Sequence, residues 1–221
     1  MVSWVLFDLN GTLLDPTPVG EPAGLGPRGG ETVLAAAVHA SMVDTMSGTY
    51  RPLPELLRAA LEREVALQDG LEEGIEEALQ RAAAMPPFPD AAAAFGVLRG
   101  AGVRVGVLTN SATEAAEAAL GSAGLEPELV VGSDSVEVYK PDRRVYDAGV
   151  EATGGRAEDV CLVAAHWWDV LGARRAGLRT AWVARKERVL MPGTGPEWTG
   201  EDLLATAQAI TCVRNPPGQV G

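Results

Sequence analysis

The sequence contains two cysteines, Cys161 and Cys212, among 221 residues. Neither belongs to a CxxC pair or a Cys/His cluster, so the sequence does not indicate a zinc site. Cys161 lies in an apolar run typical of a buried thiol, and a disulfide between the two cysteines stays open. No apolar run approaches the roughly 20 residues that cross a bilayer. The first residues, MVSWVLFD, lack the basic start and long apolar stretch of a signal peptide, so a cytoplasmic location is expected.

Positive charge is scarce. Lys and Arg number 18 against 30 Asp and Glu, which gives a net charge of −12. A chain of this charge repels phosphate backbones and anionic lipids, so nucleic-acid and membrane partners are not expected. A small anionic substrate remains compatible, because one pocket of the surface can still be locally positive.

Strand and helix patterns alternate along most of the chain, in which 47% of residues are hydrophobic. Short apolar runs predict strands at 4–7, 103–108, 129–131, 160–164 and 180–183. Helical spacing predicts helices at 31–46, 54–68, 71–84, 91–99, 113–123, 142–153, 169–176 and 201–210. The alternation predicts an α/β fold, with a Rossmann-like parallel-sheet core and helices on both faces.

One block interrupts this alternation. Residues 17–30 are rich in Pro and Gly and indicate a flexible connection, several helical stretches follow, and the prolines at 86–89 end the block. We therefore predict a core formed by 1–15 and 90–213 with an inserted all-helical cap at 16–89. Residues 214–221 indicate a loose tail.

Four polar clusters each follow a predicted strand: DLNGT at 8–12, TNS at 109–111, YKP at 139–141 and HWWD at 166–169. The carboxyl ends of parallel strands meet at one edge of a sheet, where ligands bind. Asp8 is the natural nucleophile, because a carboxylate can form an ester or acyl phosphate that water then releases. Lys140 would keep Asp8 ionised and offset charge in the transition state.

The remaining cluster residues have supporting interpretations. Thr12 would donate its hydroxyl to the nucleophile, Thr109 and Asn110 would orient substrate oxygens, and Asp169 would hold Lys140 or a water. Each residue taken alone also fits a structural role, as a turn residue, a helix cap or a packing aromatic. Their joint occurrence at successive strand ends favours the functional interpretation.

The clusters resemble the motifs of the haloacid dehalogenase-like superfamily. FDLNGTL at 7–13 matches its first motif, and LTNS at 108–111 resembles its second. VYKPDRRVY at 138–146 is similar to the third motif of the L-2-haloacid dehalogenase branch, and AAHWWD at 164–169 with GAR at 172–174 resembles its fourth. The resemblance extends from Trp4 to about Trp182.

This resemblance implies a hydrolase acting on a small carboxylic acid. Asp8 would attack carbon 2 and expel halide, and water would hydrolyse the resulting aspartyl ester without a cofactor. The implied catalytic residues are Asp8, Thr12, Lys140 and Asp169. The candidate substrate-binding residues are Asn10, Arg51, Thr109, Asn110, Tyr146, His166 and Trp168. Members of this branch often form dimers, so a homodimer is compatible with the resemblance.

Two departures from the family pattern matter. Phosphatases of the superfamily carry an acid where Asn10 stands, and Asn cannot donate a proton in that role. Dehalogenases usually carry an aromatic residue there. They also hold the halide with a cap arginine, whose expected position falls near Asp44. The nearest substitute, Arg51, lies about two helical turns away.

The fourth motif bears on metal binding. Metal-dependent members usually place an acid early in this loop, where Ala164 and Ala165 stand. Asp8, the carbonyl of Asn10 and Asp169 could still supply oxygen ligands, so Mg²⁺ is disfavoured without being ruled out, and we expect no bound metal.

Three hypotheses follow from these residues. The first is a 2-haloacid dehalogenase-like hydrolase, and the second is a magnesium-dependent phosphatase of a small metabolite, with His166 as the candidate acid. The third is a binding protein of the same fold that has lost catalysis and uses Trp167 and Trp168 as its contact surface.

Overall fold

A computed structural model describes residues 1–212 of the protein. Its six strands form one parallel sheet with the order β3-β2-β1-β4-β5-β6. The strands are β1 (Trp4–Phe7), β2 (Arg104–Thr109), β3 (Leu129–Gly132), β4 (Val160–Ala164), β5 (Arg179–Val183) and β6 (Trp198–Gly200). The predicted α/β fold is confirmed. Strand β6 was not predicted, because three residues at a sheet edge are too short to show a hydrophobic pattern.

The helices lie close to the predicted positions. They are α1 (Gly29–Ser47), α2 (Leu53–Gln68), α3 (Ile75–Ala83), α4 (Ala91–Gly100), α5 (Thr113–Ser122), α6 (Arg143–Thr153), α7 (Trp167–Ala176) and α8 (Leu203–Cys212). Short 3-10 helices occur at η1 (Thr17–Gly20), η2 (Glu72–Gly74), η3 (Ser133–Ser135) and η4 (Ala157–Asp159). The single helix predicted at 71–84 is divided into η2 and α3, and the connection predicted at 17–30 contains η1 and the first two residues of α1.

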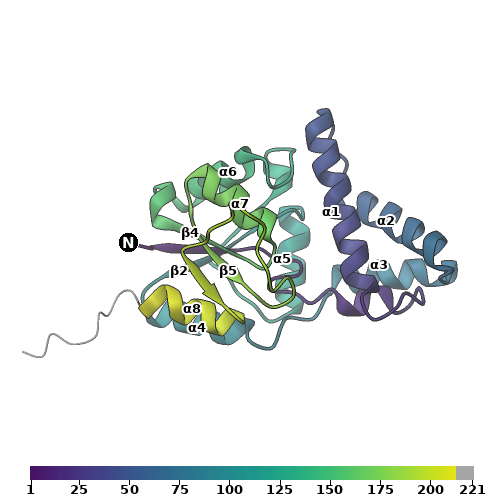
Figure 1. Cartoon of the computed structure of the whole chain (residues 1–221), viewed down its shortest axis with the longest axis horizontal. Coiled ribbons are helices and arrows are strands. Elements are labelled where there is room, and N and C mark those ends of the chain that lie inside the picture. Colours follow the sequence, from purple (N-terminus) through teal and green to yellow (C-terminus); the bar gives the residue numbers. More distant parts are fainter. Residues whose placement is uncertain (213–221) are drawn as a thin grey trace, which may run out of the picture.

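Helices cover both faces of the sheet (Figure 1). Along β1, Val5 and Phe7 belong to one hydrophobic cluster, whereas Trp4 and Leu6 belong to another. The first cluster contains residues of α4, α5 and α8, and the second contains residues of α6 and α7. Successive side chains of a strand point to opposite faces, so a fully apolar β1 is the pattern expected of a central strand buried on both sides.

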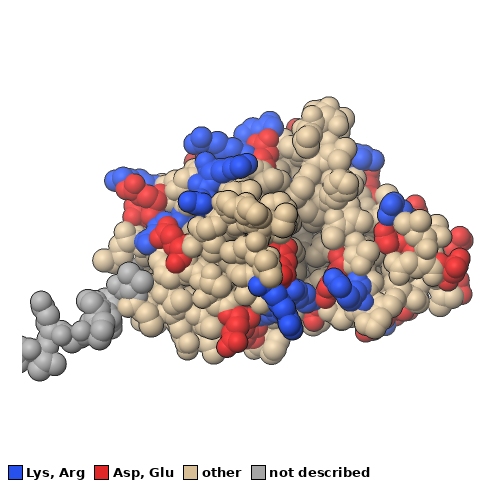
Figure 2. Space-filling view, viewed as in Figure 1, with Lys and Arg blue, Asp and Glu red and all other residues tan. Residues whose placement is uncertain are grey.

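Helices α1, α2 and α3 form a separate group beside the sheet (Figure 1). They enclose a small core of their own, which includes Val33, Leu61 and Ala78. Figure 2 shows a hollow between this helical group and the sheet, with acidic and basic side chains interspersed on the surface. The helical group corresponds to the cap expected from the sequence, and the boundaries at 15/16 and 89/90 stay predictions.

Tyr139 joins the helical cap to the core. Its hydroxyl donates to the carbonyl oxygen of Arg51 at 2.5 Å, and its backbone N–H donates to the hydroxyl of Thr45 at 3.0 Å. Its ring stacks on Tyr50 with 4.9 Å between the ring centroids. A core loop is thereby attached to the end of α1 and the segment before α2.

The remaining expectations concern cysteines, membrane spans and the tail. Both cysteines are free thiols, with Cys161 buried and Cys212 exposed. Within residues 1–212, no helix combines the length and hydropathy required to traverse a lipid bilayer. The tail expected at 214–221 lies outside the described residues, as does residue 213.

Gly30 allows η1 to pack against the start of α1. A Cβ atom built on Gly30 would overlap the carbonyl oxygen of Pro16. Gly96, in contrast, lies in α4 with no heavy atom within 4 Å of such a Cβ. Alanine substitutions at these two glycines therefore distinguish the effect of close packing on stability from the effect of helix propensity.

We expect Gly30→Ala to lower the free energy of unfolding by roughly 1–3 kcal/mol, because η1 must move away from α1. Gly96→Ala is the matched control, and we expect it to raise that free energy by about 0.5–1 kcal/mol, since alanine is the better helix former. Urea denaturation of both variants measures these changes. Stabilisation by Gly30→Ala would contradict the packing of η1 described above.

Candidate active site

Asp8 directly follows β1, the strand at the centre of the sheet. Its backbone N–H donates to the carbonyl oxygen of Val163 in β4 at 3.0 Å, which extends the pairing of β1 and β4 by one residue. The residue is only 5% exposed. The chain then turns at Gly11, whose φ is +84°, and a Cβ there would lie 2.8 Å from Cε1 of His166. Only glycine combines this backbone conformation with the close approach of the imidazole.

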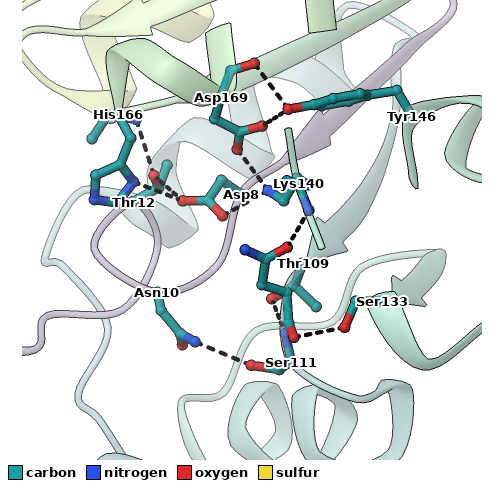
Figure 3. Close-up of polar contacts among 12 residues, drawn as sticks. Asp8, Asn10, Thr12, Thr109, Ser111, Ser133, Lys140, Tyr146, His166 and Asp169 are labelled. Carbon is teal, nitrogen blue, oxygen red and sulfur yellow. Dashed lines mark hydrogen bonds and ion pairs between the residues drawn. The ribbon is translucent and has the colours of Figure 1, made fainter. Parts of the chain in front are cut away.

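A buried ammonium group joins two carboxylates at the ends of different strands (Figure 3). Lys140 Nζ donates to Oδ1 of Asp8 at 2.9 Å and to Oδ2 of Asp169 at 2.6 Å. The side chains of Lys140 and Asp169 are fully buried, and that of Asp8 is 7% exposed. The structure thus brings together three residues that are far apart in the sequence.

This arrangement sets the charge of the Asp8 carboxylate. Burial alone would raise the pKa of Asp8, but the charge of Lys140 and the hydrogen bond with His166 outweigh burial and bring the pKa well below its usual range. Burial lowers the pKa of Lys140, yet the charges of Asp169 and Asp8 raise it overall. Asp8 is therefore held as a carboxylate beside a charged ammonium. Burial leaves the pKa of Asp169 raised despite the same ammonium.

The second oxygen of Asp8 has two further partners. Thr12 donates its hydroxyl to Oδ2 at 2.7 Å, and the same hydroxyl accepts from the backbone N–H of Ala165 at 3.0 Å. His166 Nδ1 lies 3.3 Å from Oδ2. The His166 ring stacks on Trp168 with 5.4 Å between the ring centroids. Burial lowers the pKa of His166, but the hydrogen bond and charge of Asp8 raise it overall.

Tyr146 contacts Asp169 directly. Its hydroxyl donates to Oδ1 of Asp169 at 2.7 Å, and its side chain is completely buried. It does not line the small cavity beside Asp8, so the structure places it behind Asp169 and away from the position expected of a substrate-binding residue.

Asn110 presents an unused donor in the lining of the cavity that also includes Asp8. Its Oδ1 accepts from the backbone N–H of Lys140 at 2.8 Å, whereas its buried Nδ2 has no hydrogen-bond partner among the described residues. Thr109 uses its hydroxyl to accept from the N–H of Ser111 at 3.1 Å, and Asn10 donates to the Ser111 hydroxyl at 3.1 Å. Buried amide donors are usually paired, so Nδ2 of Asn110 is available to a ligand.

A cavity of about 20 Å³ adjoins Asp8. Its lining comprises Asp8, Asn10, Leu34, Val38, Leu53, Thr109, Asn110, His166 and Trp168. Leu34, Val38 and Leu53 come from the cap and were not predicted as site residues. They are apolar residues in helical patterns, and such patterns do not distinguish a lid over a nucleophile from an ordinary core.

The expectation that Arg51 contacts substrate is not supported by its position. Arg51 forms two hydrogen bonds with the Asp44 carboxylate, at 2.8 and 2.6 Å, and neither residue lines the cavity beside Asp8. No cationic side chain of the described cap residues lines that cavity, where the three apolar side chains stand instead. The buried Asp44 carboxylate takes up the charge of Arg51 within the cap.

The acidic residues do not fit a magnesium ion. Both oxygens of Asp169 already accept, one from Tyr146 and the other from Lys140. The Lys140 ammonium stands between the two carboxylates that would have to share a cation. Within residues 1–212, no group of three or more His, Cys, Asp and Glu side chains is arranged to hold a metal.

Known proteins share the fold and part of the sequence. Residues 2–177 match the family described as haloacid dehalogenase-like hydrolases. The chain belongs to this family. It is 34% identical over 103 residues to haloacetate dehalogenase H-2 of Moraxella sp. (strain B), covering 46% of each chain. It is 30% identical over 127 residues to an (S)-2-haloacid dehalogenase of Pseudomonas sp. (strain YL), covering 56% of this chain and 55% of the relative.

A solved structure extends the similarity in fold. The L-2-haloacid dehalogenase of Xanthobacter autotrophicus with chloropropionic acid covalently bound aligns with a TM-score of 0.83 at 23% identity. The alignment covers 95% of this chain and 98% of that one. By sequence, the chain spans about half the length of the two curated relatives described above.

Removing the buried ammonium should destabilise the fold. We expect Lys140→Met to lower the free energy of unfolding by about 3–5 kcal/mol, because two buried carboxylates lose their counter-charge. Without that charge, burial raises both carboxyl pKa values in the folded state above the unfolded ones. The folded variant then binds more protons, so its stability should fall as the pH rises from about 5 to about 8.

Lys186→Met provides the control for this measurement. Lys186 is 32% exposed and pairs with Asp15 and Glu31 at the surface, so its loss should cost about 1 kcal/mol or less. Urea denaturation at both pH values compares the variants. If both variants lost the same free energy of unfolding at both pH values, the result would argue against a buried ionic site.

Proposed function

We propose that this protein is a 2-haloacid dehalogenase-like hydrolase that uses Asp8 as its nucleophile. The observation that carries this proposal is the buried Asp8 carboxylate, held 2.9 Å from the Lys140 ammonium at the edge of a cavity. The low pKa of Asp8 leaves the carboxylate free of a proton, and burial removes the water that would weaken its attack. The curated relatives named as haloacid dehalogenases support the same substrate class.

The first step is a displacement at carbon 2 of the substrate. A carboxylate oxygen of Asp8 forms a bond to carbon 2, the carbon–halogen bond breaks, and the electron pair leaves with the halide. The unpaired Nδ2 donor of Asn110 lines the same cavity and is available to the leaving group or to the substrate carboxylate. The covalent adduct named in the Xanthobacter autotrophicus structure is the type of intermediate that this step produces.

The second step is hydrolysis of the Asp8 ester. Water attacks the carboxyl carbon of Asp8, the negative charge develops near Lys140, and the bond to the hydroxy acid breaks. A base must accept the proton from water. His166 is suited to this role, because its Nδ1 is 3.3 Å from Asp8 and its side chain is 25% exposed.

The state of Asp8 would control the basicity of His166. The Asp8 charge raises the pKa of His166 in the free enzyme. Once Asp8 is esterified, that charge is gone, and the burial that lowers the pKa of His166 is opposed only by the smaller effects of the Glu187 and Asp169 charges. The imidazole of the ester then loses its proton more readily, can accept a proton from the attacking water and can return it to solvent afterwards.

The phosphatase alternative is less well supported. Asn10 stands where an acid is required, and its amide donates to Ser111. The residues around Asp8 also do not fit magnesium. A binding protein without catalysis is disfavoured because Asp8, Lys140 and Asp169 retain their mutual contacts. A cytoplasmic location and a homodimer stay expectations from the sequence.

The central test is halide release from (S)-2-chloropropionate. We expect Asp8→Asn to reduce kcat/KM by roughly 10³-fold or more, because an amide does not displace halide. Asp147→Asn, which changes an exposed carboxylate on α6, should leave the rate unchanged. A single turnover in water enriched in oxygen-18 should label Asp8, as measured by mass spectrometry of its peptide. Halide release at equal rates from wild type and Asp8→Asn would refute the proposal.

The role of His166 has a separate test. We expect His166→Gln to slow ester hydrolysis by roughly 10²-fold or more while halide is still released in a first burst, so that the ester accumulates. In wild type, the burst should be independent of pH from about 5 to about 8, since Asp8 stays ionised, whereas hydrolysis should rise with pH as His166 loses its proton.

His39→Gln is the matched control, because His39 is exposed on α1. Rapid quenching with mass detection of the Asp8 peptide measures the ester. If His166→Gln slowed both steps equally, His166 would not be the base for hydrolysis.

A further inference from the structure

A second, larger cavity lies beside the one that contains Asp8. It measures about 470 Å³ and is bounded by α5 of the core and by α1, α2 and α3 of the cap. This volume is within the range of about 300–1,000 Å³ that is typical of small-molecule sites. None of the catalytic residues proposed above lines it, so the cavity has no role in the mechanism described so far.

The two cavities share a wall. Asn10, Leu34 and Leu53 line both of them. Asn10 donates to Ser111, which lines the larger cavity. The two cavities therefore meet at the side chains of these three residues.

The small cavity cannot hold a substrate by itself. Its volume of about 20 Å³ is close to that of one enclosed water molecule. The reacting carbon must lie against Asp8, so any longer carbon chain attached to it has to extend beyond this space. The shared wall directs such a chain toward the larger cavity.

The larger cavity has the chemistry of an alkyl-chain site. Leu57 and Leu79 of the cap face Ala115 and Ala119 of α5 across it, with Val19 of η1 beside them. The charged residues in its lining are Glu55, Arg58 and Glu62, all exposed or half-buried residues of α2. An apolar interior with charges confined to one helix favours a hydrocarbon chain over a polar group.

We infer that this cavity binds the alkyl chain of the substrate, so that the enzyme prefers straight-chain 2-haloacids of medium length over 2-halopropionate. The inference rests on the proposed function, and it adds a substrate class that the catalytic residues do not determine. The carboxylate and carbon 2 lie beside Asp8, and the chain passes Asn10 and Leu53 into the larger cavity.

The kinetic test compares 2-bromo acids with three to eight carbons. Each buried methylene should raise kcat/KM by up to about fourfold, the equivalent of about 0.8 kcal/mol of transfer free energy. We therefore expect 2-bromooctanoate to exceed 2-bromopropionate by at least about tenfold. If kcat/KM stayed constant or fell along the series while 2-bromopropionate was still hydrolysed, the larger cavity would not be an alkyl-chain site. The proposed function would be unaffected by that result.

Filling the cavity should remove this preference. Ala115→Trp on α5 and Ala83→Trp on α3 each add a large side chain at an exposed helical position that lines the cavity. We expect both variants to lower kcat/KM for 2-bromooctanoate to about that of 2-bromopropionate, whose own value should not change. Ala118→Trp is the control, because Ala118 is exposed on the same α5 helix outside the cavity. An unchanged chain-length preference in both filling variants would refute the inference.

A binding measurement keeps the two proposals distinguishable. Calorimetry with octanoate, which has no leaving group, measures binding of an alkyl chain to the larger cavity without turnover. We expect octanoate to bind wild type and Ala118→Trp at least about tenfold more tightly than acetate does, and to lose this advantage in Ala115→Trp. If no haloacid is hydrolysed but octanoate binds in this way, the proposed function is wrong and the larger cavity is still a site for alkyl chains. If octanoate binds wild type no more tightly than acetate does, the inference that the larger cavity binds alkyl chains is refuted.

Discussion

The rest of the site depends on the ion pairs that the Lys140 ammonium forms with two carboxylates. The ammonium is fully buried, and it bonds to a carboxylate from the end of β1 and another from the start of α7. A buried charge is tolerated when it is paired and hydrogen-bonded, and here the pairing also keeps Asp8 in its reactive form. Stability and chemistry therefore share one interaction. Tyr146 and Thr12 complete it by binding the carboxylate oxygens that Lys140 leaves available.

Much of this arrangement follows from local features of the sequence. A short apolar strand followed by Asp8 predicted β1 and the position of Asp8, because parallel strands place their carboxyl ends at one edge. The same reasoning brought Lys140 and Asp169 to that edge. Tertiary contacts decided the features that the sequence did not indicate. Tyr146 turned out to face Asp169 and not the cavity, and Arg51 turned out to pair with Asp44.

The cap residues that line the cavity beside Asp8 could not be identified from the sequence. The family resemblance predicts a cationic side chain there, whereas the structure places Leu34, Val38 and Leu53 around the cavity beside Asp8. Helical periodicity identifies these residues as buried, but it contains no information on whether the neighbour is another helix or a reacting carboxylate. An apolar lid strengthens every electrostatic interaction beneath it, because it lowers the local dielectric response around Asp8 and Lys140. The apolar side chains at these three positions therefore strengthen the ion pair between Asp8 and Lys140.

The residue that precedes Lys140 connects the buried ion pair to the cap. Tyr139 holds the cap through Arg51, Thr45 and Tyr50, and its carbonyl carbon is covalently bonded to the nitrogen of Lys140. Any hinge movement that lifts the cap away from the sheet pulls on this one peptide unit. The position of the cap and the alignment of the ammonium with Asp8 are therefore linked through a single residue, whose side chain contacts the cap and whose backbone continues into Lys140.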